Sequence, residues 1–280
     1  MTRDSLNTNM ASSVLSVQSV APQQSLYDQI LDEIQKLLEA LVKTGTRTPE
    51  GKKLEARFTT EMSLYFRRLA RKFPYSSLAS YVNQYKESKE SDARKLMGRA
   101  VEVGSSDLRI TIEGNATKGY ELGGTQAAQA VRIKPTFALV DEGAKKWIRK
   151  RAAEQVTNID EVTRDRLARL LVDGVDRGLS VPKIGRLIRT DIMDMSVYRG
   201  KLIATTELNE SMSEASLQTY KRLAITHKSW STVGDDRVSE ECLANEAQGA
   251  IKIDATFSGG KDRPPQHPGC RCTLVPERVR

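Results

Sequence analysis

The chain has 280 residues, a length typical of about two domains, and 39% hydrophobic, 5% aromatic and 29% charged residues indicate a soluble, helix-rich protein. No apolar run approaches the roughly 20 residues of a membrane-spanning helix, so we do not expect an integral membrane protein. The formal net charge of +8 favours an acidic partner, such as nucleic acid or an acidic protein surface.

The N-terminal part is predicted to be a flexible arm followed by helices. Residues 1–24 are rich in Ser, Thr, Asn and Gln without a sustained apolar period, and they lack the layout of a secretory signal or transit peptide. The region 25–104 is predicted to be helical. Apolar residues at spacings of three and four predict a pair of packed helices at 25–45 and 49–73, and a more polar helical pattern covers 76–103.

Residues 105–135 are predicted to form a strand and loop connector. Leu108–Ile112 alternates like a short strand, and four glycines follow between 114 and 125. Their order does not match that of a phosphate-binding loop.

Residues 136–225 are predicted to be a helical bundle. We expect helices at 139–156 and 160–177, a short helix after Ser180, a loop at Asp191–Met195 and a long helix at 197–223. A basic run on the first of these is a candidate contact for the DNA backbone, because clustered Lys and Arg neutralise phosphates. The alternative is a solvated charged face. The run contains Lys145, Lys146, Arg149, Lys150 and Arg151.

Residues 226–280 are predicted to form a small β-rich Cys/His module, with strands at 227–233, 251–257 and 272–275 and a helical turn near 240–242. Thiolate and imidazole are preferred zinc ligands, and a structural zinc site needs four of them. A tight turn at Pro268-Gly269 would let two of these ligands converge. The sequence therefore predicts a structural zinc site at Cys242, His267, Cys270 and Cys272.

Two other interpretations of these residues remain open. The cysteines also fit the role of small buried hydrophobic side chains, with His267 capping a turn. Disulfides are the other alternative. The odd count of three cysteines and the lack of a signal peptide argue against them.

Several short motifs in the second half of the chain occur in a characteristic order. Ala204-Thr205-Thr206-Glu207 follows Arg199, Trp230 precedes Asp236-Arg237 and Cys242, and the string Pro264-Pro265-Gln266-His267-Pro268-Gly269-Cys270-Arg271-Cys272-Thr273-Leu274 closes the set. Over about 140–276, this order resembles the Mu F-like phage head morphogenesis family, also called minor head proteins. The family-motif residues are Glu207, Trp230, Asp236, Arg237 and Arg271.

One position departs from the family pattern. The family usually has a C-x2-C pair after the Asp-Arg pair, whereas this chain has Ser239 and then Cys242. The site therefore either closes with three cysteines and one histidine or has lost its metal.

The resemblance implies a structural, non-enzymatic virion component of a tailed bacteriophage. It implies a location at the portal vertex or capsid interior, or in the host cytoplasm during assembly. It also implies contacts with the portal or major capsid protein and with packaged double-stranded DNA, and a role in head morphogenesis, DNA packaging or ejection. The alternatives are a metal-dependent nuclease or toxin-like enzyme and a zinc-stapled DNA-binding protein. Against an enzyme, four Cys/His ligands leave no open position on a zinc ion.

Overall fold

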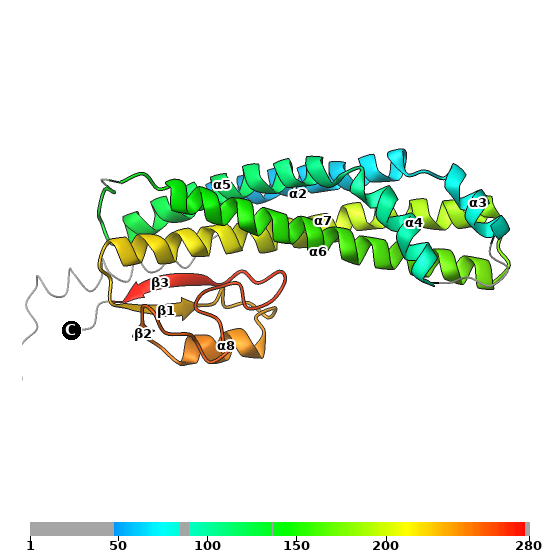
Figure 1. Ribbon diagram of the computed structural model, residues 1–280. Coiled ribbons are helices and arrows are strands. Elements are labelled where there is room, and N and C mark those ends of the chain that lie inside the picture. Colours follow the sequence, from blue (N-terminus) through cyan, green and yellow to red (C-terminus); the bar gives the residue numbers. More distant parts are fainter. Residues whose placement is uncertain (1–47, 85–89, 136, 278–280) are drawn as a thin grey trace, which may run out of the picture. The chain divides into compact units, whose positions relative to one another are not determined.

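The computed structural model describes residues 48–84, 90–135 and 137–277. Within these ranges, seven helices account for most residues, and three short strands form one antiparallel sheet (Figure 1). This confirms the predicted mainly α fold with a small β-rich part. The predicted arm at 1–24 and helix at 25–45 lie outside the described residues. None of the described helices has both the length and the apolar character needed to cross a membrane.

The first described helix is α2 (Pro49–Lys72), as its apolar period predicted. The Thr48 side chain accepts a hydrogen bond from the Gly51 N–H, which satisfies one of the free donors at the helix start. The predicted apolar stripe is buried, and it includes Phe58, Met62, Tyr65 and Leu69. Two shorter helices follow, α3 (Ser76–Gln84) and α4 (Glu90–Glu102).

The strand and loop predicted at 105–135 are wrong, because α5 (Ser105–Ala130) is one continuous helix. Leu108 and Ile112 are four residues apart and lie buried on one helix face, a spacing that also fits an alternating strand. A Cβ atom on Gly114 would have no other atom within 4 Å. The other three glycines lie where α5 meets α7 (Val181–Arg222), and a Cβ atom on Gly123 would collide with the backbone of Met212. These glycines therefore allow two helices to approach closely.

Two predicted interruptions between helices are also wrong. The helix α6 (Glu142–Asp176) runs through the boundary expected at 156–160, and α7 runs through the loop expected at Asp191–Met195. Ile188, Ile192 and Met195 continue the buried stripe of α7. Asp191, the first residue of the expected loop, instead pairs with Arg166 of α6, with 2.6 Å between Nη2 and Oδ1.

The long helix α7 is the central element of the helical part. It packs against α5 and α2 along most of its length, and α4 packs against α6. The largest apolar cluster lies among these helices. A second cluster lies at the C-terminal end of α7, where Tyr220 and Leu217 contact the C-terminal module, which we define as residues 226–277.

The C-terminal module contains a sheet in the order β2-β1-β3. The central strand β1 (His227–Ser231) pairs antiparallel with β2 (Ile251–Lys252) and with β3 (Thr273–Glu277). The strand predicted at 251–257 is only two residues long, and the predicted helical turn extends to a short helix, α8 (Glu240–Ala247). β3 contacts α7, and α8 contacts β1 (Figure 1).

Candidate metal centre

Three cysteine side chains meet inside the C-terminal module. Cys242 lies on α8, whereas Cys270 and Cys272 lie in the segment that leads into β3. All three are buried, and their Sγ atoms lie within 4.8 Å of one another, with 3.7 Å between those of Cys242 and Cys270. Two zinc–sulfur bonds of about 2.3 Å at a tetrahedral angle would place the sulfurs about 3.8 Å apart. The spacing of the cysteines therefore fits ligands of one metal ion.

His267 is not part of this group of ligand atoms. The turn predicted at Pro268-Gly269 forms, because the Cys270 N–H donates to the His267 carbonyl oxygen at 3.1 Å and Gly269 has a φ of 75°. The imidazole is partly exposed, and its Nδ1 lies 3.0 Å from the carbonyl oxygen of Pro268. The structure thus brings together three of the four predicted ligands.

The three thiols share hydrogen bonds, which shift their acidity. Thiol donors from Cys242 and Cys272 lower the pKa of Cys270 well below its usual range. The same contacts, together with burial, raise the pKa of Cys242 and of Cys272. The hydrogen bonds therefore favour the thiolate form of Cys270, and the thiolate is the form of cysteine that binds metals.

Trp230, a family-motif residue, belongs to the same buried apolar cluster as the three cysteines. Its buried ring packs edge-on against Phe257, with 5.2 Å between ring centroids. Its indole N–H makes no hydrogen bond to an oxygen or nitrogen atom in the described part of the chain, and it lies near enough to Cys272 to lower the pKa of that thiol. A donor beside a sulfur stabilises the charged thiolate.

Ser239 has a clear structural role at the position where the family pattern has cysteine. It is the N-cap of α8, and its hydroxyl oxygen accepts a hydrogen bond from the Cys242 N–H at 3.2 Å. Serine is among the residues that best satisfy the free donors of a helix start. The substitution therefore fixes the helix that carries Cys242.

One stretch of α7 holds the cysteine segment in place. The Thr206 hydroxyl oxygen accepts a hydrogen bond from the Gly269 N–H at 2.9 Å. The Asn209 amide donates to the Cys270 carbonyl oxygen at 2.8 Å, and its own oxygen accepts from the Ser213 hydroxyl at 3.1 Å. These contacts tie the loop that carries two cysteines to the central helix.

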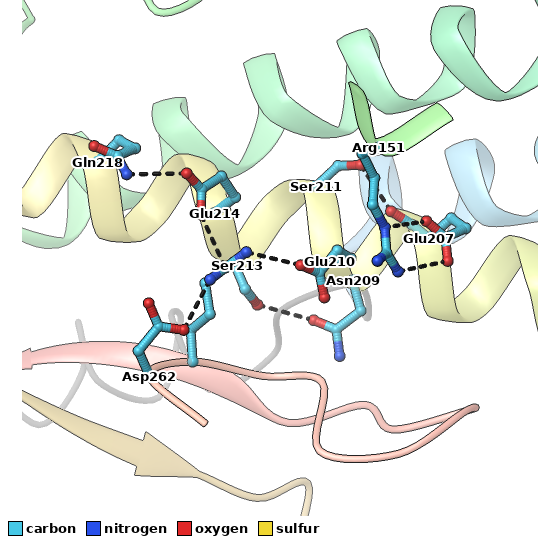
Figure 2. Close-up of polar contacts among 10 residues, drawn as sticks. Arg151, Glu207, Asn209, Glu210, Ser211, Ser213, Glu214, Gln218 and Asp262 are labelled. Atoms are coloured by element: carbon cyan, nitrogen blue, oxygen red, sulfur yellow. Dashed lines mark hydrogen bonds and ion pairs between the residues drawn. The ribbon is translucent and has the colours of Figure 1, made fainter. Parts of the chain in front are cut away.

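Glu207 connects the same part of α7 to α6. Figure 2 shows its carboxylate facing the Arg151 guanidinium, with a distance of 2.9 Å from Nε to Oε2 and 3.0 Å from Nη2 to Oε1. The glutamate is buried, which raises its pKa, while Arg151 acts in the opposite direction. Arg151, predicted as a DNA contact, is therefore paired inside the protein.

The other four residues of the basic run lie on the exposed side of α6. Lys145 pairs with Glu142 at 2.7 Å, and Lys150 lies 3.8 Å from Glu154. Lys146 and Arg149 are exposed as well. This part of α6 presents positive charge to solvent, although each pair offsets part of it.

The two arginines of the motif, Arg237 and Arg271, lie beside Asp235, the residue that precedes the motif residue Asp236. Both Arg271 nitrogens Nη1 and Nη2 lie 2.7 Å from an Asp235 carboxylate oxygen, and Arg237 Nη2 lies 3.3 Å from the same carboxylate. Asp236 is exposed. Asp235, which precedes the Asp-Arg pair of the motif, therefore ties the loop before α8 to the segment between the cysteines.

Sequence reasoning missed Arg263, which lies between three carboxylates. Its guanidinium is 2.7 Å from Glu210, 3.0 Å from Glu214 and 2.8 Å from Asp262, whose side chains are labelled in Figure 2. The sequence feature that could have indicated this cluster is the pair Glu210 and Glu214 on α7. Residues four apart share one helix face, so both carboxylates can meet one cation. This cluster is a further tie between α7 and the C-terminal module.

The fold and the site define a helical protein whose C-terminal module is held to one long helix by a cysteine-bearing loop and several buried polar contacts. Residues 165–275 match the family model described as Phage Mu protein F like protein. The match confirms the resemblance inferred from the motifs, and it supports a protein related to phage head morphogenesis. Neither the curated proteins nor the solved structures contain a match to the chain.

Proposed function

We propose that this chain is a minor head protein of a tailed bacteriophage, located at the portal vertex or in the capsid interior. The family match supports this proposal most directly, because it covers α7 and the C-terminal module to β3. In this role the protein binds the portal or the major capsid protein during head morphogenesis. It also contributes to DNA packaging or ejection.

The roles of the motif residues support a structural function. Glu207 pairs with Arg151, Arg271 pairs with Asp235, and Trp230 fills the apolar cluster of the C-terminal module. Each of these side chains joins two parts of the protein. A catalytic set would instead converge on a space where a substrate atom fits. We therefore propose that the protein is not an enzyme.

Analysis of purified heads tests this function. Mass spectrometry of particles from the phage that encodes the chain should detect it in mature heads, in fewer copies than the major capsid protein. Crosslinking in intact heads should join it to the portal or the major capsid protein. Recovery of the chain only in the particle-free fraction would contradict the proposal.

The cysteine cluster is the candidate zinc site of this protein. Cys242, Cys270 and Cys272 would supply three thiolates, and His267 would supply the fourth ligand once its imidazole leaves the Pro268 carbonyl. A zinc ion there would join α8 to the segment before β3. A small module gains stability from such a link, because its apolar core is limited.

Packaged double-stranded DNA is the second partner in this proposal. The exposed lysines and arginine of α6, Lys145, Lys146, Arg149 and Lys150, would contact phosphates without reading sequence. Arg151 is left out of this set, because its guanidinium is paired with Glu207.

A metal-dependent nuclease is the competing function. Its metal ion would need a position open to water and to a phosphodiester. The three cysteines are each no more than 4% exposed, so a backbone phosphate does not reach them without rearrangement of the C-terminal module. Metal-dependent plasmid nicking that disappears with Cys270→Ser would favour the nuclease over the structural role.

A further inference from the structure

A groove of about 500 Å³ lies where the start of α2, the middle of α7 and two loops of the C-terminal module meet. The loops are the one that precedes α8 and the one that carries the cysteines. The side chains that matter here are Lys52, Tyr198, Lys201, Leu202, Arg237 and Arg271. Two of them, Arg237 and Arg271, belong to the family motif, and no role described above uses the groove that they line.

The charge of the groove is strongly positive. Four of its lining residues are cationic, and Glu55 is the acidic one. The Glu55 carboxylate is engaged with the Thr205 hydroxyl at 2.7 Å, and Arg271 is engaged with Asp235. Arg237 also lies 3.3 Å from Asp235, but its side chain stays 71% exposed. Lys52 and Lys201 are exposed as well, so these three cations can meet a partner that carries carboxylates.

The same surface exposes large apolar side chains of α7. Tyr198 is 80% exposed and Leu202 is 45% exposed, and both line the groove. Val197, one residue from Tyr198, is 58% exposed. Adjacent exposed apolar side chains rimmed by charge are typical of a protein interaction site, because a partner removes them from water.

We infer that this groove binds an acidic segment of another protein, one that also carries apolar side chains. Its carboxylates contact Lys52, Lys201 and Arg237, and its apolar side chains cover Tyr198 and Leu202. Duplex DNA fits less well, because a phosphate backbone satisfies the cations but leaves the apolar side chains of α7 in water. The inference adds a binding surface to the proposed function, and the presence of the chain in phage heads does not depend on it.

Binding of short fluorescent peptides to the full chain tests the inference. The probe is a synthetic peptide that alternates glutamate with leucine and phenylalanine. One control peptide replaces each glutamate with glutamine, and a second replaces each apolar residue with serine. Fluorescence anisotropy should show binding of the acidic, apolar peptide that weakens as salt rises, and weaker binding of both control peptides.

Charge-reversal variants identify the surface. The pair Lys52→Glu and Lys201→Glu should raise the Kd of the acidic, apolar peptide by about tenfold or more. The matched pair Lys53→Glu and Lys183→Glu changes the net charge by the same amount, but at exposed sites outside the groove. It should leave the Kd nearly unchanged. Tyr198→Ser should weaken binding without any change in charge. Circular dichroism melting curves confirm that each variant is folded.

Three results would overturn the inference. The first is no binding of the acidic, apolar peptide to the folded chain. The second is equal loss of affinity in the groove pair and the matched pair, which would indicate a non-specific charge effect. The third is that the groove pair of substitutions abolishes binding of duplex DNA but leaves peptide binding unchanged. This result would indicate that the groove is a nucleic-acid site.

Discussion

The Asn209 side-chain amide donates a hydrogen bond to the backbone carbonyl oxygen of Cys270 across 2.8 Å, although the two residues are 61 positions apart in the chain. Both groups are buried. The bond links the middle of α7 to the loop that carries two of the three cysteines. The helical part and the candidate metal centre are therefore mechanically connected.

Replacement of Asn209 with alanine should destabilise the protein. The change leaves the Cys270 carbonyl oxygen and the Ser213 hydroxyl without this partner, and an unsatisfied buried polar group costs about 1–3 kcal/mol. Urea unfolding measures the loss. Asn158→Ala, at an exposed site on α6, should change the free energy of unfolding by no more than about 0.5 kcal/mol. Equal effects of the two substitutions would contradict the assigned role of Asn209.

Because Arg151 pairs with the buried Glu207, its substitution should destabilise the protein more than substitution of the exposed Lys150. Arg151→Ala leaves a buried carboxylate without its cation and should cost about 3 kcal/mol of unfolding free energy. The double substitution Arg151→Met with Glu207→Leu should recover much of this loss, because no charge remains buried. Lys150→Ala, one residue earlier and exposed, is the control. If Arg151→Ala and Lys150→Ala were equally mild, the pair would have no structural role.

Two glycines of α5 should respond in opposite directions to the same substitution. Gly123→Ala places a methyl group against the backbone of Met212 and should cost about 1–3 kcal/mol by overpacking. A Cβ atom on Gly114 would have no other atom within 4 Å, so Gly114→Ala should stabilise the helix by up to about 1 kcal/mol. Thermal unfolding followed by circular dichroism compares them. A tolerated Gly123→Ala would mean that α5 and α7 do not approach as closely as described.

The exposed basic residues of α6 predict salt-dependent DNA binding. Conversion of Lys145, Lys146, Arg149 and Lys150 to glutamine should weaken binding to a duplex and reduce the slope of log K against log salt by about 0.9 for each phosphate that is no longer neutralised. Filter binding over a salt series measures both quantities. A variant with exposed basic residues of α2 replaced, Arg67→Gln, Arg71→Gln and Lys72→Gln, is the comparison. DNA binding that is unchanged in the α6 variant would rule out α6 as the DNA-binding surface.

The sequence predicted the mainly α class and most helix positions in the described residues, because burial there follows a regular helical period. In α2, for example, Phe58, Met62, Tyr65 and Leu69 recur at spacings of three and four and are all buried. Several of the wrong predictions involve residues that usually mark loops. The glycines of α5 and the aspartate at 191 look like loop residues until a second helix is placed beside them, and one sequence does not reveal that neighbour.

The candidate site was predictable to a similar extent. Cysteine is rare in this chain, so its three positions were identified from the sequence, and the structure brings them together. His267 was chosen for its ligand chemistry and its spacing, and neither determines where an imidazole points. Asp235 and Asp236 are adjacent and chemically identical, so only the fold decides which one pairs with Arg271. Arg263 is an isolated arginine in the sequence, and its partner Glu210 on α7 lies 53 positions earlier in the chain.

The candidate metal centre requires the three cysteines to act as ligands of one metal ion, and the zinc content of the purified full chain tests this most directly. Elemental analysis of protein prepared under reducing conditions without chelator should find about one zinc per chain. Cys270→Ser should lose the metal and lower the unfolding temperature, His267→Ala should weaken zinc binding, and His227→Ala should leave it unchanged. A chain that contains no zinc, and whose unfolding temperature is the same with and without Cys270→Ser, would contradict the account.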